Sequence, residues 1–154
     1  MIQQYELDFI RESNRIEGIL REPTQAEIDA YVEFMQLDEL TITDVEKYVK
    51  AIQPNAVLRQ HTGLDVRVGN YYPPKGGQKI LHELANLLDR INEDMFMSKC
   101  DIFKTHVEYE QLHPFTDGNG RSGRMIWWWQ MKGSQIGFLH QFYYQTLTHL
   151  QTTK

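Results

Sequence analysis

Apolar residues recur every three or four positions along most of the chain, which is the spacing that buries one face of an α-helix. The pattern is clearest in five aliphatic residues: Ile80, Leu84, Leu87, Leu88 and Ile91. With the capping signals, it predicts further helices at about residues 2–19, 24–37, 43–53, 98–112, 122–132 and 135–149. The predicted fold class is mainly α, a compact helical bundle.

Polar residues mark where several of these helices start. Two capping boxes, in which a threonine is followed three residues later by a glutamate, are expected: Thr24 with Glu27, and Thr43 with Glu46. Ser98 is expected to cap the helix that ends near Leu112. Gly133 is expected to separate the last two helices.

Residues 54–77 break the helical pattern and are rich in glycine and proline. A short exposed β-hairpin is predicted for seven residues of this segment: Val66, Arg67, Val68, Gly69, Asn70, Tyr71 and Tyr72. The two valines alternate with an arginine, and the Gly-Asn pair supplies a tight turn before the tyrosines. Either tyrosine also suits the wall of a nucleotide cleft.

Length and charge describe one small domain. The chain has 154 residues, which suits a single domain over 1–154 with its own core. The net charge of −5 argues against nucleic acid as a partner. One cysteine excludes an internal disulfide and favours the cytoplasm. Charges among the first apolar residues predict neither a signal peptide nor membrane insertion.

Residues 113–124, HPFTDGNGRSGR, combine the parts of a nucleotide site. Pro114 discourages helix at the residue before it, so His113 is expected at the mouth of a loop. A histidine, with a pKa near 7, suits a general base that activates a hydroxyl. Asp117 is a hard oxygen ligand of the kind that holds Mg²⁺ together with phosphate oxygens.

The second half of this segment is suited to anions. Gly118 and Gly120 allow positive φ, and successive N–H groups leading into a helix form an anion cradle. Arg121 and Arg124 are three positions apart, so both can lie on one helical face and reach phosphate oxygens. Because all of these parts occur together, a purely structural role is disfavoured.

This segment resembles the signature of the Fic family, H-x-F-x-(D/E)-G-N-(G/K)-R-x-x-R, at every specified position. The resemblance implies a protein adenylyltransferase, which moves AMP from ATP to a Ser, Thr or Tyr hydroxyl of a target protein and releases pyrophosphate. It also implies Mg²⁺ or Mn²⁺ as cofactor and ATP as co-substrate. Larger members carry additional domains that this sequence does not show.

Roles follow from the resemblance position by position. His113 corresponds to the general base, Asp117 to the metal ligand, and Phe115 to an aromatic that packs inward and anchors the loop. The anion nest corresponds to Gly118, Asn119 and Gly120, and the groups that hold the β- and γ-phosphates to Arg121 and Arg124. A glycine at 120 implies AMP transfer, because relatives with lysine there phosphorylate. The hairpin corresponds to the flap that docks the target as an added strand.

A second motif lies at residues 13–18, SNRIEG, and resembles the family's inhibitory helix pattern (S/T)-x-x-x-E-(G/N). The corresponding residues are Ser13, Glu17 and Gly18, within the helix expected at about 2–19. Ser13 and Glu17 are four apart and share a helical face. The resemblance implies the class whose inhibitory helix precedes the core in the same chain, with Glu17 pairing with Arg124.

Two other clusters have simpler interpretations. His106, Glu110 and His113 do not form an HExxH motif, so zinc is not expected, and His106 is expected to be packed or solvated. The run of three tryptophans at 127–129 is expected to pack a helix, with at least one partly exposed.

The sequence leaves several alternatives open. The same fold could phosphorylate, transfer another nucleotide or remove AMP, or it could be an inactive binding or toxin-type partner. The intact signature argues against the inactive form, and Gly120 argues against phosphorylation. The target, the modified residue, the nucleotide preference, the signal that relieves inhibition and a homo-oligomeric state all stay open.

Overall fold

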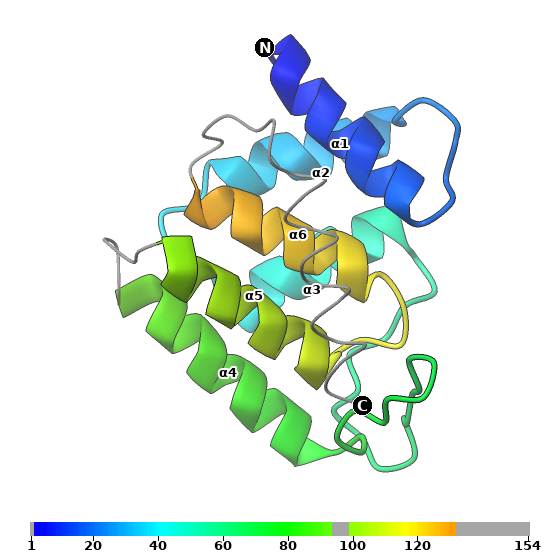
Figure 1. The fold of residues 1–154 in the computed structure, drawn as a ribbon, viewed down its shortest axis with the longest axis vertical. Helices are drawn as coiled ribbons and strands as arrows, with labels where there is room; N and C mark the ends of the chain where they lie inside the picture. The colour runs from blue at the N-terminus through cyan, green and yellow to red at the C-terminus, as the bar shows by residue number, and fades with distance from the viewer. Residues whose placement is uncertain (1, 94–98, 132–154) are drawn as a thin grey trace.

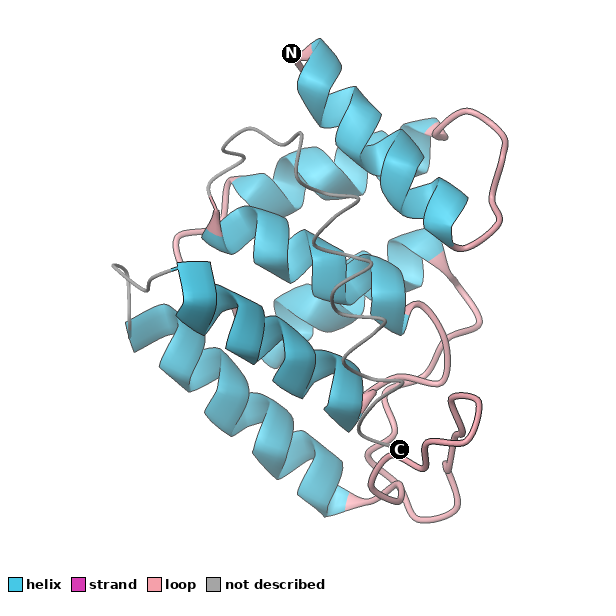
Figure 2. Ribbon diagram, in the orientation of Figure 1, coloured by secondary structure: helices cyan, strands magenta, loops and turns pink. Residues whose placement is uncertain are grey.

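The structure is a computed structural model that describes residues 2–93 and 99–131 (Figure 1). Its helices are α1 (Gln4–Ile16), α2 (Gln25–Met35), α3 (Ile42–Ile52), α4 (Gln78–Glu93), α5 (Lys99–Leu112) and α6 (Asn119–Gln130). Loops connect these helices, and no strand is drawn in the described part of the chain (Figure 2). The predicted mainly α fold is confirmed. The helix predicted at 135–149 and the Ser98 cap lie outside the described residues.

Helix α6 is the centre of the bundle. It packs against α1, α2, α3 and α5. On one side α6, α5 and α4 lie next to one another in alternating directions (Figure 1). The apolar face predicted from the spacing in residues 80–91 is buried in α4, as expected. None of the described helices is both long enough and apolar enough to cross a membrane.

Capping decides where α2 and α3 begin. At α2 the predicted box is present, with Thr24 Oγ1 accepting from Glu27 N at 3.2 Å and Glu27 Oε1 accepting from Thr24 N at 2.7 Å. At α3 the prediction of Thr43 with Glu46 is wrong, because the box is formed by Thr41 and Asp44.

The earlier start of α3 has a packing reason. Starting at Thr41 places the fully buried Leu40 just before the cap and the fully buried Val45 one turn into the helix. An apolar pair at these two positions fixes how the chain enters a helix. A box at Thr43 would pair Ile42 with Lys47 at these two positions, and because Lys47 is exposed, the same apolar contact is not available there.

All three tryptophans of α6 are buried, so the prediction that at least one is partly exposed is wrong. Trp128 stacks on Phe9 of α1 with 4.1 Å between ring centroids, and its indole N–H donates to Tyr31 Oη at 2.8 Å. Trp129 donates to Leu37 O at 3.0 Å. A central helix has neighbours on every side, so three consecutive large side chains can all be covered.

The loop between α3 and α4 runs beside the segment that joins α5 to α6. Leu58 and Phe115 form an antiparallel bridge, and Arg59 N donates to Pro114 O at 2.8 Å. Farther along the loop, Val68 and Tyr71 exchange backbone hydrogen bonds of 2.9 and 2.8 Å around the Gly69–Asn70 turn. This single bridge closes a tight turn and is not part of a longer strand, so the flap stays a prediction.

Candidate active site

The segment between α5 and α6 begins with an unusual backbone conformation at His113. Its φ is 51°, and its N–H donates to Tyr109 O at 3.0 Å to finish α5. A left-handed residue at this position is a common way to end a helix. The next apolar residue, Phe115, is 1% exposed, so the inward packing implied by the resemblance is present.

Asn119 closes the loop. Its side-chain oxygen accepts from Phe115 N at 2.9 Å, and its side-chain nitrogen donates to Phe115 O at 2.7 Å. The side chain is 2% exposed and therefore holds the loop together instead of facing a ligand. Any part of Asn119 in anion binding belongs to its backbone N–H.

The N-terminus of α6 supplies that backbone. Gly118 is the N-cap residue with φ of 78°, and no described side chain caps this end of α6. The helix therefore starts at Asn119, three residues before the predicted position, because glycine adopts the left-handed cap without strain. Asp117 is exposed beside it, and its Oδ1 accepts from Gly118 N at 2.8 Å.

These groups surround one pocket of about 390 Å³. Its walls come from the loop before α6, the start of α6, the end of α1 and the end of α3: Glu17, Ile19, Gln53, His113, Thr116, Asp117, Gly118, Asn119, Gly120 and Arg121. The structure thus brings His113, Asp117 and the α6 N-terminus together, as the sequence predicts. Residues 66–72 do not line this pocket.

His113 is neutral at pH 7. The pKa of its imidazole is lowered to about 4, mainly by burial and also by the nearby Arg59 guanidinium, whereas a hydrogen bond to the backbone of Glu110 and the charges of Glu17 and Asp117 act against the shift. Its pKa is thus shifted below the value near 7 expected for a histidine base. A neutral imidazole is still the form that accepts a proton.

Arg124 meets the inhibitory motif. Its Nη2 lies 2.7 Å from Glu17 Oε2 and donates to Ser13 O at 3.0 Å, and its Nε donates to Ser13 Oγ at 2.8 Å. The Arg124 side chain is 1% exposed, whereas the Glu17 side chain is 38% exposed. The pairing implied for Glu17 and Arg124 is present in the structure.

The Glu17 carboxylate also lies over the first turn of α6. A side chain at Gly120 would collide with Glu17 Oε2. Gly18 follows with φ of 79° and ends α1, since its N–H donates to Arg15 O at 2.9 Å and Ile19 N donates to Asn14 O at 3.0 Å. Gly18 thus turns the chain immediately after Glu17.

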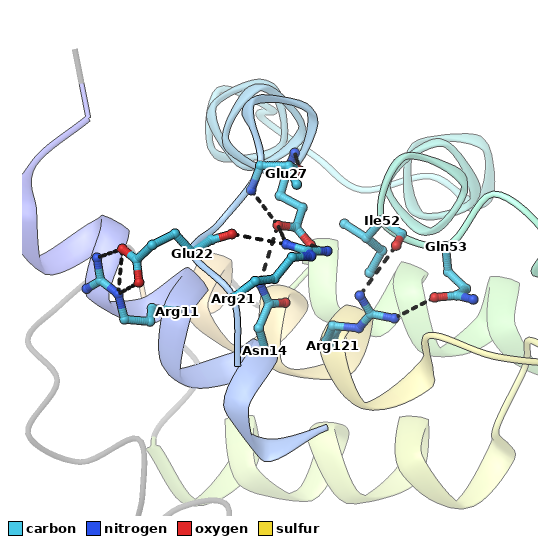
Figure 3. Close-up of polar contacts among 9 residues, drawn as sticks. Arg11, Asn14, Arg21, Glu22, Glu27, Ile52, Gln53 and Arg121 are labelled. Atoms are coloured by element: carbon cyan, nitrogen blue, oxygen red, sulfur yellow. Dashed lines mark hydrogen bonds and ion pairs between the residues drawn. The ribbon is translucent and has the colours of Figure 1, made fainter. Parts of the chain in front are cut away.

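Arg121 points toward the end of α3 (Figure 3). Its Nη2 donates to Gln53 Oε1 at 3.0 Å and its Nη1 to Ile52 O at 3.4 Å. Its Nε is buried without a hydrogen-bond partner among the described residues. Arg121 lines the pocket with donor capacity to spare, and its role toward phosphate stays a prediction.

Two ion pairs hold the loop after α1, and the sequence analysis did not single them out (Figure 3). Arg11 of α1 pairs with Glu22 at 2.6 Å, and Arg21 pairs with Glu27 of α2 at 3.0 Å. Glu27 also accepts from Asn14 at 3.4 Å, next to Ser13. The capping box at Glu27 was visible in the sequence, but its second role as the link to α1 depends on packing.

His106 and Glu110 are buried behind Arg124. Burial lowers the pKa of His106 to about 3 and raises the pKa of Glu110 to about 8, so both are neutral at pH 7. Their 3.8 Å contact is therefore not an ion pair. No group of three or more potential metal-binding side chains is found within residues 2–93 and 99–131.

The Fic/DOC family model matches residues 36–131, from the end of α2 through α6. The chain belongs to the Fic/DOC family. It is 27% identical over 130 residues to a protein of Caenorhabditis briggsae and 25% identical over 130 residues to one of Caenorhabditis elegans, both named protein adenylyltransferase fic-1. Each alignment covers 76% of this Fic/DOC chain and 24% of the relative, so the chain spans about a quarter of the relatives' length.

Proposed function

We propose that this Fic/DOC chain is a protein adenylyltransferase that transfers AMP from ATP to a hydroxyl of a target protein. The observation that carries the proposal is the pocket in which His113, Asp117 and the uncapped start of α6 converge. The family membership and the names of the two nematode relatives support the same reaction.

In the proposed reaction, the hydroxyl oxygen of the target attacks the α-phosphorus of ATP. The bond between that phosphorus and the bridging oxygen to the β-phosphate breaks, and pyrophosphate leaves. The hydroxyl proton moves to the neutral imidazole of His113, which lines the pocket. The product is a phosphodiester between AMP and the target.

The triphosphate would be held by backbone and arginine donors. The first N–H groups of α6 point along the helix axis into an anion site, and Arg121 has a spare donor at the same place. Asp117 is exposed and would hold Mg²⁺, which favours one or two carboxylates plus phosphate oxygens and water. The ion would neutralise phosphate charge.

We also propose that Glu17 restrains the enzyme. Its carboxylate occupies the space over Gly120 and engages Arg124, so it stands where an incoming phosphate would meet the same donors. A phosphate and this carboxylate compete for one guanidinium fork. The target would dock near residues 66–72, where the Val68–Tyr71 turn exposes backbone and Tyr72 is 69% exposed.

The test compares ATP labelled on the α-phosphate with ATP labelled on the γ-phosphate, incubated with Glu17→Gly protein, Mg²⁺ and a cell lysate. AMP transfer labels protein from the α-position only, whereas phosphorylation labels it from the γ-position only. His113→Ala in the same background should lower transfer by about 10²–10⁴-fold. His82→Ala, an exposed histidine of α4, is the matched control. Label from the γ-position, or full transfer without His113, would reject the proposed reaction.

The metal is tested in the same assay. Asp117→Ala should weaken Mg²⁺-dependent nucleotide binding, and excess chelator should abolish transfer. Equal transfer with chelator present would remove the metal from the proposal.

A further inference from the structure

Arg59, in the loop between α3 and α4, is completely buried. Its guanidinium donates to four backbone carbonyl oxygens. Nε donates to His113 O at 2.7 Å and Nη2 to Leu112 O at 2.9 Å. Nη1 donates to Leu64 O at 3.0 Å and Pro74 O at 2.9 Å. One side chain therefore joins three separate stretches of backbone.

All three stretches lie at segments to which a function is proposed. The carbonyls of Leu112 and His113 lie at the junction where α5 ends and the pocket loop begins. The carbonyls of Leu64 and Pro74 flank residues 66–72, the segment predicted to dock the target. The backbone of Arg59 adds a hydrogen bond to Pro114 O at 2.8 Å. The contacts of Arg59 thus run from the docking segment to the pocket.

His113 needs such support because its backbone is strained. It is the one residue other than glycine with positive φ in the described part of the chain. For an L-residue the left-handed conformation costs about 1–2 kcal/mol, and it persists only when its surroundings hold it. Donors on the carbonyls of residues 112 and 113 hold the peptide groups on both sides of the His113 Cα.

Only a guanidinium can make this set of contacts. Its planar fork directs five N–H donors in fixed directions, whereas a lysine ammonium is a compact group with three donors on a flexible stem. The four partners of Arg59 are neutral carbonyls, so its role is geometric and not that of an ion pair. Arg59 does not line the pocket, so it does not touch a nucleotide there.

We propose that Arg59 is a positioning residue that fixes His113 in its left-handed conformation and ties it to both ends of the predicted docking segment. Sequence alone offers no sign of this, because the partners are backbone carbonyls that any residue carries. The proposal uses the proposed function only in taking His113 as the base.

The first test follows the His113 ring directly and requires no activity. Protein with ¹³C-labelled histidine is titrated by NMR, and the His113 signal is assigned with His113→Asn. In Arg59→Lys we expect the ring resonance to shift and its titration midpoint to rise toward 6.5, because the freed imidazole becomes more solvated. Arg59→Gln, which also removes the charge, should raise the midpoint at least as far.

A control separates positioning from general stability. Asn92 connects the end of α4 to the loop before α3 through two hydrogen bonds with Leu40, of 2.8 and 2.7 Å, whereas His113 follows the opposite end of the antiparallel α4–α5 pair. Asn92→Ala should lower the melting temperature and leave the His113 resonance and midpoint unchanged. The proposal is overturned if Arg59→Lys leaves the His113 resonance as in the wild type, or if Asn92→Ala moves it equally.

The second test measures rates in the Glu17→Gly background. Arg59→Lys should lower kcat by roughly 10²-fold, the effect of misplacing a catalytic group by about 1 Å, with KM for ATP unchanged. An unchanged kcat, or a loss confined to KM, would overturn the proposal. If no variant transfers label at all, the proposed function fails, while the NMR comparison still decides the role of Arg59.

Discussion

Arg59 and Arg124 are both buried, but only Arg124 donates to a charged group. Arg59 is held by four neutral backbone carbonyls, two from the loop between α3 and α4 and two from the end of α5 and the residue after it. Arg124 is held by α1, through Ser13 and the carboxylate of Glu17. The first set is built into the fold, whereas the Glu17 carboxylate is 38% exposed and can turn toward water.

The difference shows which contact can be exchanged. The four carbonyl oxygens belong to the backbone of the α3–α4 loop and of the end of α5, so they can separate from Arg59 only if that backbone moves. Glu17 follows the last turn of α1, and the loop beyond it is fastened by the Arg11–Glu22 pair, whose glutamate is 69% exposed, and by the Arg21–Glu27 pair, whose glutamate is 3% exposed. The Arg11–Glu22 pair is screened by water and contributes little to stability. We infer that the contacts of Arg59 are a fixed part of the fold, whereas Arg124 can exchange the Glu17 carboxylate for a ligand.

The largest effect is expected from Glu17→Gly, which removes the exchangeable partner of Arg124. Transfer should rise by roughly 10²–10³-fold, comparable to restoring one donor to a developing negative charge. Initial rates with α-labelled ATP measure this. Arg15→Gly, an exposed position in the last turn of α1, controls for weakened helix. Equal rates for wild type and Glu17→Gly would show that the ion pair is not a restraint.

The next largest effect is expected on stability, which should fall more when Arg59 is replaced than when Arg124 is replaced. Arg59→Met should cost about 3 kcal/mol or more, since each buried carbonyl left without a donor costs about 1–3 kcal/mol. Arg124→Met should cost less, because Glu17 can be hydrated once it is released. Urea unfolding of the two variants under identical conditions gives the comparison. A larger loss of stability for Arg124→Met than for Arg59→Met would show that the contacts of Arg124, and not those of Arg59, are the fixed ones.

Each arginine also lowers the pKa of a buried histidine. Burial is the main cause in both cases, with Arg124 adding to it at His106 and Arg59 at His113. Both folded pKa values lie below the ordinary 6.5, so the stability due to neutral histidine is present above pH 6.5 and is lost as the pH falls toward about 4 for His113 and about 3 for His106.

Each histidine should therefore lower the free energy of unfolding by about 1.4 kcal/mol per pH unit below pH 6.5, whereas Glu110, whose pKa burial raises to about 8, acts in the opposite direction between pH 8 and pH 4.5. Urea unfolding at pH 7.5, 6 and 5 checks the slope. His106→Asn should flatten it without touching the pocket. A slope that is the same in wild type and His106→Asn would show that His106 does not contribute.

The smallest effect is expected at Tyr71, a second tie between the docking segment and α5. Its hydroxyl donates to Gln111 O at 2.7 Å. Tyr71→Phe should cost about 1 kcal/mol of stability, the net value of one hydrogen bond. It should lower transfer to the protein target more than nucleotide affinity, measured by calorimetry. Normal transfer by this variant would leave Arg59 as the sole tie that matters.

Much of this arrangement could be predicted from the sequence. The apolar spacing in α4, the Thr24 box and the twelve-residue signature each depend on neighbours within a few positions, so local pattern was enough. Arg59 could not be predicted, because its partners are carbonyls up to 54 positions away and carry no side-chain signature. The start of α3 was misplaced because Thr41 and Thr43 can each open a capping box, and the burial of Leu40 beside Thr41 becomes visible only in the folded chain.

The position of the Glu17 carboxylate over Gly120 affects which side chains position 120 can hold. Any side chain at position 120 meets Glu17 Oε2, and the lysine of phosphorylating relatives is among the longest. A side chain at position 120 would therefore displace the Glu17 carboxylate, which is 38% exposed and can move aside. The contact between Glu17 and Arg124 therefore depends on glycine at position 120, where a larger side chain would push the carboxylate away.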